Sequence, residues 1–203
     1  MTTPAAQTAA SLRAAGRAPA QPFAVALGDG RELVVHRILR LLPGKRIVGE
    51  AELADSRVLA KLFIAPGSAR HWQREREGIA ALAAAGIPTP ALLHAGELAE
   101  GGHALLTDFL TDAVSLAERW QAVARLPAGH SDALAVLAPA FAMLGRLHMN
   151  GLVQDDLHLG NFLVSGSRLM VIDGDAVRAL TPGQPLQADA ASANFAILAA
   201  QLP

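Results

Sequence analysis

The sequence of 203 residues contains no cysteine, which excludes disulfide bonds, thiolate metal sites and thiol catalysis. An excess of charge of one sign is also missing, because 17 Lys and Arg stand against 18 Asp and Glu. General binders of nucleic acid or of anionic membranes carry a basic excess, so we expect no nucleic-acid partner. The apolar fraction of 52% is sufficient for a packed core, and the length predicts one domain or two small lobes.

Long hydrophobic runs are absent as well. The longest apolar stretch, 133–145, contains Pro139 and is shorter than the roughly 20 residues that a bilayer crossing requires. Residues 1–22 have no basic start followed by an apolar block, so we do not interpret them as a signal peptide and predict a mobile tail. These absences favour a cytoplasmic protein without a transmembrane segment.

Strand signals dominate the first half of the chain. Apolar runs separated by turn residues predict a meander of antiparallel strands over 23–64, and two more strands at 91–95 and 103–109. A helix with Ser68 as its N-cap is predicted between them. The sheet and this helix form a predicted N-terminal lobe, residues 23–110.

Helix signals dominate the second half, which we predict to be a short C-terminal lobe, residues 111–203. Helices are predicted at 115–126, 132–150 and 188–200, and a strand hairpin at 162–172. The sequence therefore predicts an α+β protein of two lobes, with ligands expected between them.

Lysine is scarce, since only Lys45 and Lys61 occur among the 17 basic residues. Lys61 lies in an apolar run (VLAKLF) that is predicted to be a strand. Trp72, Glu75 and Ile79 follow at helical spacing, which puts the Glu75 carboxylate on an apolar face. An unpaired buried charge is costly, so we predict that Lys61 and Glu75 form an ion pair.

Three further polar residues surround the predicted hairpin. Asp156 and Asn161 are five residues apart in a loop, and Asp173 follows the run LMVI. If the two strands pair, their ends bring Asn161 and Asp173 to one mouth of the hairpin. An amide oxygen and a carboxylate oxygen suit Mg²⁺, and Asp156 could orient or deprotonate an attacking hydroxyl.

The order of these features resembles the protein-kinase fold. Lys61 lies in a strand, Glu75 in the next helix, Asp156 and Asn161 in a loop, and Asp173 after a hairpin. This resemblance implies a bilobal protein-kinase-like fold, with an antiparallel sheet and one helix in the N-lobe and a small, mainly helical C-lobe.

Three segments are similar, more narrowly, to the lipopolysaccharide kinase family of Gram-negative bacteria, whose members phosphorylate heptose or Kdo sugars. The segments are REREGIAALAAAGIPTP, LHMNGLVQDDLHLGNFLV and VIDGDAV. The similarity covers about residues 35–180. Its most specific string, Asp-Leu-His-x-Gly-Asn, also occurs in antibiotic phosphotransferases, so it indicates the superfamily better than the substrate.

The resemblance implies ATP as cofactor and a set of residues that bind it. Lys61 would contact the α and β phosphates, with Glu75 positioning the lysine. Gly44 lies in the segment 42–49, which corresponds to a glycine-rich loop over the phosphates. The backbone of Asp108, Phe109 and Leu110, three consecutive residues, would meet the adenine.

The resemblance also implies Mg²⁺ and the groups around the reacting phosphate. Asn161 and Asp173 would be its metal ligands. Asp156 would be the catalytic base, and His158 would approach the γ-phosphate. The acceptor would be a hydroxyl of a small molecule or of a lipid-linked sugar, which leaves contact with the inner face of the inner membrane open.

The chain departs from the kinase pattern in four places. Gln154 stands where the catalytic loop usually has a histidine, the metal motif is 173–175 (Asp-Gly-Asp), the glycine-rich loop is reduced, and only 30 residues follow Asp173. Two alternatives therefore stay open, an atypical small protein kinase and a pseudokinase that binds nucleotide or a partner. The short C-terminal lobe indicates either a small substrate or a truncated lobe. At residue level, Asp155 competes with Asp156 as the base.

Overall fold

The computed structural model describes residues 4–127 and 129–202, which form two compact units. The first unit comprises the chain up to Arg76 together with Ala91–Phe109. The second unit comprises Glu77–Pro90 and the chain from Leu110 onward. The chain passes into the second unit for the last time between Phe109 and Leu110, close to the lobe boundary predicted after residue 110. The segment 77–90 was predicted in the N-terminal lobe, but it groups with the second unit.

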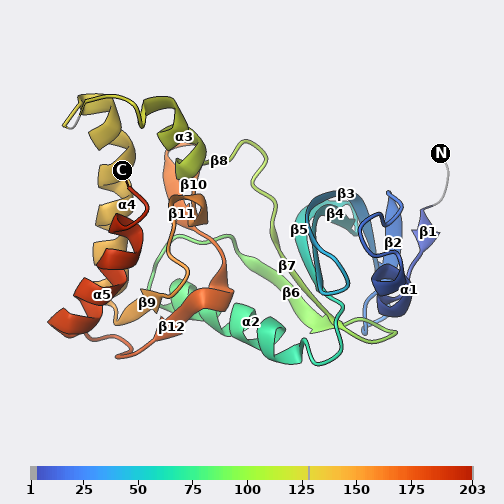
Figure 1. The fold of residues 1–203 in the computed structure, drawn as a ribbon. Helices are drawn as coiled ribbons and strands as arrows, with labels where there is room; N and C mark the ends of the chain where they lie inside the picture. Colours follow the sequence, from blue (N-terminus) through green and yellow to red (C-terminus); the bar gives the residue numbers. More distant parts are fainter. Residues whose placement is uncertain (1–3, 128, 203) are drawn as a thin grey trace. The chain divides into compact units, whose positions relative to one another are not determined.

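The first unit is built on a seven-stranded sheet in the order β1-β2-β3-β4-β5-β7-β6 (Figure 1). Apart from the parallel pair β1–β2, neighbouring strands are antiparallel, as the sequence predicts. Its elements are β1 (Ala5–Ala6), α1 (Ala9–Ala14), β2 (Phe23–Ala26), β3 (Glu32–Leu42), β4 (Arg46–Leu53), β5 (Ser56–Phe63), β6 (Leu92–Glu97) and β7 (His103–Asp108), and the first half of α2 (Ala69–Ala84).

Local sequence explains the tight connection between β4 and β5. Leu53 pairs with Ser56, which leaves the two-residue turn Ala54-Asp55. Both turn residues have positive φ, 47° and 65°, as a type I′ hairpin requires. The turn fixes the register that places Lys61 opposite Val48.

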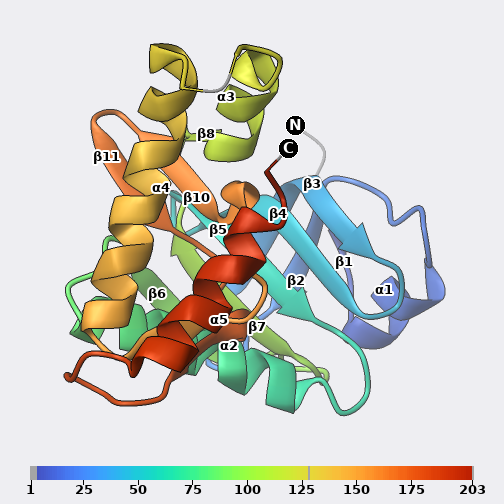
Figure 2. The same cartoon turned by 60° about the vertical axis from the view of Figure 1, so that its left-hand side comes forward.

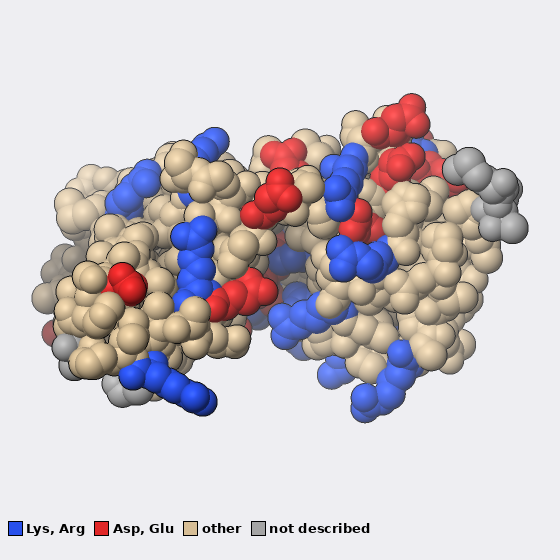
Figure 3. Space-filling model, turned by 90° about the horizontal axis from the view of Figure 1, so that it is seen from above, with Lys and Arg blue, Asp and Glu red and all other residues tan. Residues whose placement is uncertain are grey.

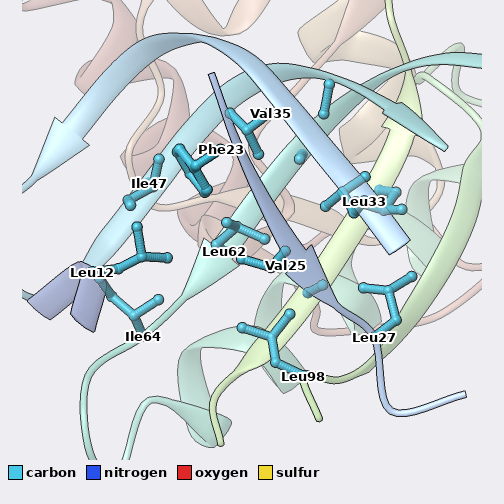
Figure 4. Close-up of a cluster of buried hydrophobic side chains, with 14 of the residues drawn as sticks. Leu12, Phe23, Val25, Leu27, Leu33, Val35, Ile47, Leu62, Ile64 and Leu98 are labelled. Carbon is cyan, nitrogen blue, oxygen red and sulfur yellow. The ribbon is translucent and has the colours of Figure 1, made fainter. Parts of the chain in front are cut away.

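The described part of the N-terminal segment, residues 4–22, contains β1 and α1, which differs from the mobile tail predicted for residues 1–22. Ala5 and Ala6 pair with β2, and Thr8 caps α1 by accepting a hydrogen bond from the Ser11 backbone N–H. Leu12 is 2% exposed and packs in the main apolar cluster of the first unit (Figure 4). Burial of Leu12 and Ala9, together with the pairing of β1, contributes free energy that offsets the entropy cost of ordering this segment.

The second unit combines three helices with short strand pairs. Its elements are the second half of α2, β8 (Val114–Ser115), α3 (Leu116–Val123), α4 (Ser131–Met149), β9 (Leu152–Gln154), the 3₁₀ turn η1 (Leu159–Asn161), β10 (Phe162–Ser165), β11 (Arg168–Val171), the 3₁₀ turn η2 (Gly174–Ala176), β12 (Val177–Ala179) and α5 (Ala188–Ala199). The strand order is β11-β10-β8 in one sheet and β12-β9 in another. The predicted helices and the predicted hairpin are all present.

Helices α4 and α5 lie side by side in this unit (Figures 1 and 2). The rings of Phe141 and Phe195 stack between them, with their centroids 5.3 Å apart. Leu144, Leu147 and Leu198 are buried in the second apolar cluster, against which Phe141 packs, whereas Phe195 is exposed. This packing holds α5 against the segment that carries the candidate catalytic residues.

One helix in the described part of the chain, α4, is long and apolar enough to cross a membrane by length and composition alone. No such segment was predicted, because the uninterrupted apolar stretch of the sequence ends at residue 145. A single helix of this kind is weak evidence for a span, since core helices pass the same test. On the face drawn in Figure 3, basic and acidic side chains both occur on each unit, in keeping with the balanced composition.

Candidate functional site

The predicted ion pair between Lys61 and Glu75 is present in the first unit. The Lys61 ammonium donates a hydrogen bond to Glu75 Oε1, which joins β5 to α2. The Glu75 side chain is fully buried, and the Lys61 side chain is 13% exposed. A nearby indole reinforces the docking of the helix, because Trp72 Nε1 donates to the carbonyl of Ala104 in β7 at 3.0 Å. The arrangement holds a nearly buried ammonium at a fixed place on the sheet.

The reduced glycine-rich segment is the turn between β3 and β4. Gly44 has a φ of +68° and no atom within 4 Å of where a Cβ would stand, so conformation and not space requires glycine there. The carbonyl of Lys45 accepts hydrogen bonds from the backbone N–H groups of Ile64 and Ala65, at 2.9 and 3.2 Å. At Gly49 it is space that requires glycine, because a Cβ there would lie 2.8 Å from Val35 Cγ1 and 2.9 Å from a backbone oxygen.

The three residues predicted to meet adenine lie where the chain passes from the first unit to the second. Asp108 ends β7, and its carboxylate accepts a hydrogen bond from the Ala91 backbone N–H at 3.2 Å. The guanidinium of Arg57 lies 4.3 Å from the centroid of the Phe109 ring. Leu110 is the first residue of this stretch of the second unit. The Asp108 carboxylate is therefore engaged in holding the backbone.

The hairpin of β10 and β11 brings Asn161 and Asp173 to the same end, as the sequence predicts. Phe162 pairs with Val171, and the Ile172 N–H donates to the Asn161 carbonyl at 2.9 Å. Asn161, just before β10, thus makes the last hydrogen bond of the hairpin, and Asp173 directly follows its partner Ile172. Asn161 is 3% exposed, so its side chain belongs to the interior of the second unit.

A hydrogen bond connects this hairpin end to the candidate catalytic loop. Asn161 Nδ2 donates to the carbonyl of Asp156 at 2.8 Å. Because Nδ2 faces the loop, the amide oxygen Oδ1 is the atom of Asn161 that could bind a metal. The carboxylate of Asp156 belongs to an exposed residue, as a base that meets an incoming acceptor requires.

Asp155, the competing candidate for the base, is engaged elsewhere. Its carboxylate accepts hydrogen bonds from Arg178 Nε and, at 2.8 Å, from Arg178 Nη2. The Asp155 carboxylate in turn raises the pKa of the Arg178 guanidinium through this hydrogen bond and its charge. A carboxylate held in a two-point pair is a poor acceptor for a substrate proton, so the geometry favours Asp156.

Asp156 and His158 line an open cavity of about 540 Å³ in the second unit. The remaining wall consists of Ala117, Trp120, Gln121, Leu159, Gly160 and Gln201. Trp120 of α3 and Gln201, which follows α5, were not among the predicted site residues. The sequence contains no local signal for this grouping, because Trp120 and Gln201 lie 81 positions apart.

The backbone of Asp173 adopts an uncommon conformation, with φ +68° and ψ 75°. The turn that follows is packed against α2, since a Cβ on Gly78 would stand 1.9 Å from the Gly174 carbonyl oxygen. Gly78 is thus a residue of the site that the sequence analysis missed. Its only signal in the sequence is a glycine in the middle of a predicted helix.

Among the described residues, no three His, Asp or Glu side chains converge as a ready metal cluster. Mg²⁺ does not require such a cluster, since it keeps several waters and takes one or two carboxylate oxygens from the protein. Asn161 and Asp173 supply an amide oxygen and a carboxylate at one hairpin end. The chemistry of this donor set therefore fits Mg²⁺ bound together with phosphate oxygens.

No known family profile and no curated protein sequence matches the chain. Solved structures that share its fold include the following two. One is WaaP in complex with acyl carrier protein, with a TM-score of 0.56 and 23% identity over 82% of this chain and 72% of that one. The other is vaccinia related kinase 3, with a TM-score of 0.53 and 14% identity over 89% of this chain and 59% of that one. The predicted fold class is therefore confirmed: the chain has an α+β, protein-kinase-like fold.

Proposed function

We propose that this protein is an ATP- and Mg²⁺-dependent phosphotransferase that acts on a hydroxyl of a sugar or a similar small molecule. The observation that carries the proposal is the hydrogen-bonded placement of Asp156, Asn161 and Asp173 at one end of the β10–β11 hairpin. Such residues in a protein-kinase-like fold suit phosphoryl transfer, in which catalysis is mostly positioning and charge neutralisation.

In this proposal each residue keeps a separate task. Lys61, oriented by Glu75, binds phosphate oxygens of the nucleotide in the first unit. Asn161 Oδ1 and the Asp173 carboxylate hold the Mg²⁺, which neutralises charge on the phosphates when bound. Asp156 accepts the proton of the acceptor hydroxyl.

The cavity beside Asp156 supports a small polar acceptor. Its wall combines one indole, Trp120, with the amides of Gln121 and Gln201. Indole faces pack against the apolar faces of sugar rings, and amides hydrogen-bond to hydroxyls. The sequence resemblance to lipopolysaccharide kinases favours a core sugar of lipopolysaccharide as the acceptor, and such a substrate would bring the protein to the cytoplasmic side of the membrane.

The test follows labelled phosphate from ATP into a lysate of Gram-negative cells, with and without Mg²⁺. We expect label in the lipid or sugar fraction for the wild-type protein and none for Asp156→Asn. Trp120→Ala should raise the KM for that acceptor about 10-fold while the KM for ATP stays unchanged, an effect the size of an aromatic contact.

Two other outcomes would replace the proposal. Label in protein bands would indicate a small protein kinase. Absence of any product, with a nucleotide-induced thermal shift that does not depend on Mg²⁺, would indicate a pseudokinase. The departures at Gln154 and in the segment 42–49 are the observations that favour this second outcome.

A further inference from the structure

A fully buried glutamine connects the candidate catalytic loop to the turn at Asp173. Gln154 is the last residue of β9 and is 0% exposed. Its side-chain Nε2 donates to the carbonyl of Ile172 at 3.1 Å and to the carbonyl of Asp173 at 3.3 Å. One side chain therefore holds two successive carbonyls of the turn, from a position two residues before Asp156.

A second buried amide fixes Gln154 in turn. Asn194 lies in α5 and is 3% exposed. Its Nδ2 donates to the Gln154 carbonyl at 2.8 Å, and its Oδ1 accepts from the Gln154 N–H at 3.4 Å. Because a carbonyl can only accept, the orientation of the Asn194 amide is determined by this contact.

His148 in α4 completes the chain of contacts. Its Nε2 lies 3.1 Å from Asn194 Oδ1. Since Oδ1 is an acceptor, the His148 ring carries its hydrogen on Nε2 at this contact. The connected residues thus run from α4 through α5 to β9 and end at the backbone of Asp173.

The C-terminal end of the chain makes a separate contact with the same loop. Gln201 Nε2 donates to the carbonyl of Leu157, one residue after Asp156, at 2.5 Å. The segment 154–157 is therefore held by side chains on both sides of Asp156. The carboxylate of Asp156 itself stays on an exposed residue.

These contacts act on a backbone that is costly to maintain. A left-handed conformation at a residue other than glycine persists only where its surroundings over-determine it, and Asp173 has a φ of +68°. A buried amide likewise persists only when it is hydrogen-bonded, and an apolar side chain would fill the same space without that requirement. The Nε2 group of Gln154 is hydrogen-bonded in this way, because it donates to two carbonyls of the strained turn. The Gln154 Oε1 atom is buried and has no hydrogen-bond partner among the described residues, so the donors and not the acceptor of this side chain hold the turn.

We propose that Gln154, held by Asn194 and His148, is a positioning residue that sets the backbone of Asp173 relative to the loop of Asp156. Its catalytic consequence rests on the proposed function. By this inference the absence of a histidine before Asp155 does not indicate an inactive protein, because Gln154 and the helix α5 brace the loop in its place.

The experiment compares hydrogen exchange and turnover in the full-length protein. Gln154→Met removes the donors at nearly constant volume, Gln154→His keeps a ring N–H donor, and Gln184→Met is the control at an exposed glutamine. Backbone exchange of 171–177 should be about 10-fold faster in Gln154→Met, and kcat about 10- to 100-fold lower, the size of an outer-sphere effect on a metal site. The KM for ATP should change much less, and Gln154→His should recover part of both losses.

His148→Phe tests the same chain at its far end, should Gln154→Met fold poorly. We expect a smaller rise of exchange in the same segment, 171–177, and none in β3. The inference would be overturned if segment 171–177 exchanged no faster in Gln154→Met and His148→Phe than in the control Gln184→Met. A wild-type protein without turnover would refute the proposed function. The exchange measurement needs no activity, so it would still show whether Gln154 holds the Asp173 turn.

Discussion

The two units hold their candidate site residues by different means. In the first unit, a regular sheet over an apolar cluster fixes Lys61 through strand register and an ion pair with the Glu75 carboxylate. In the second unit, the candidate residues lie on loops and short strands, and buried amides hold them. Gln154, Asn161 and Asn194 are all less than 4% exposed, and all hydrogen-bond to backbone groups of the loop or the turn.

This difference follows from what each secondary structure supplies. A sheet satisfies its own backbone hydrogen bonds, so it can place a side chain without help from other polar groups. A loop leaves backbone groups unpaired, and side-chain amides must satisfy them when the loop is buried. The first unit should therefore tolerate the loss of its polar pair if apolar residues replace it, whereas the second should not.

The largest expected effect concerns the two neighbouring aspartates of the second unit. Asp156→Asn should lower the rate of phosphate transfer by about 10³-fold, within the range for the loss of a general base. The matched variant Asp155→Asn removes a carboxylate that already pairs with Arg178, and we expect less than a 10-fold loss. Steady-state rates with ATP and acceptor measure both, and equal losses would contradict the assignment of Asp156 as the base.

The next effect tests the ion pair of the first unit. Lys61→Met leaves the fully buried Glu75 carboxylate without this counter-ion, so the free energy of unfolding should fall by about 3 kcal/mol. The double variant Lys61→Met with Glu75→Leu should regain most of that stability, because apolar residues often replace buried pairs at little cost.

Measurements of nucleotide binding distinguish the contribution of Lys61 to stability from its proposed contact with the phosphates of ATP. Both Lys61 variants should bind Mg²⁺-ATP weakly, whatever their stability, as measured by titration calorimetry. Wild-type affinity in the stable double variant would show that Lys61 serves the fold alone.

A pair of helical glycines sharpens the comparison at the Asp173 turn. Gly78→Ala places a Cβ on the Gly174 carbonyl and should cost about 1–3 kcal/mol of unfolding free energy, the usual cost of overpacking. Gly145 in α4 has open space, so Gly145→Ala should stabilise the protein by up to about 1 kcal/mol through helix propensity. Urea unfolding measures both, and a destabilised Gly145→Ala would show that helix propensity alone does not govern that site.

The smallest effect lies in the first unit, at the turn before β3. Hydrogen bonds from the Arg31 side chain and backbone lower the pKa of Asp29 from 3.8 to about 2. Because the folded pKa is the lower one, the pair stabilises the fold fully above about pH 4, and the contribution disappears as the pH falls through about 2.

Asp29→Asn should therefore reduce the thermal midpoint slightly at pH 5, and the difference from wild type should vanish near pH 2. Both partners are exposed, so screening by salt should diminish the effect. A difference that grows toward low pH would contradict the assigned direction of the shift.

Much of the architecture could be predicted because its signals are local. Apolar runs separated by turn residues predicted the meander, and the spacing of Glu75 on an apolar face predicted its pairing with Lys61. The hairpin 162–172 predicted that Asn161 and Asp173 lie at one end. In each case the sequence separation is short or the strand register is fixed by a tight turn.

The features that were not predicted from the sequence share one physical cause. Order at the N-terminus depends on the burial of Leu12 in a cluster of distant residues. The role of Gln154 depends on Asn194, forty residues later, and that of Gly78 on a carbonyl in another element. None of these contacts leaves a periodic pattern, because a single side chain makes each of them.

Periodicity and residue type were thus sufficient to predict the fold class and the chemical groups at the candidate site. The folded arrangement was needed to see that Asp155 pairs with Arg178 while Asp156 is exposed, and how the loop around them is held. Those properties belong to pairs of residues that folding brings together, and the free energy of such a pair does not exist until both partners are in place.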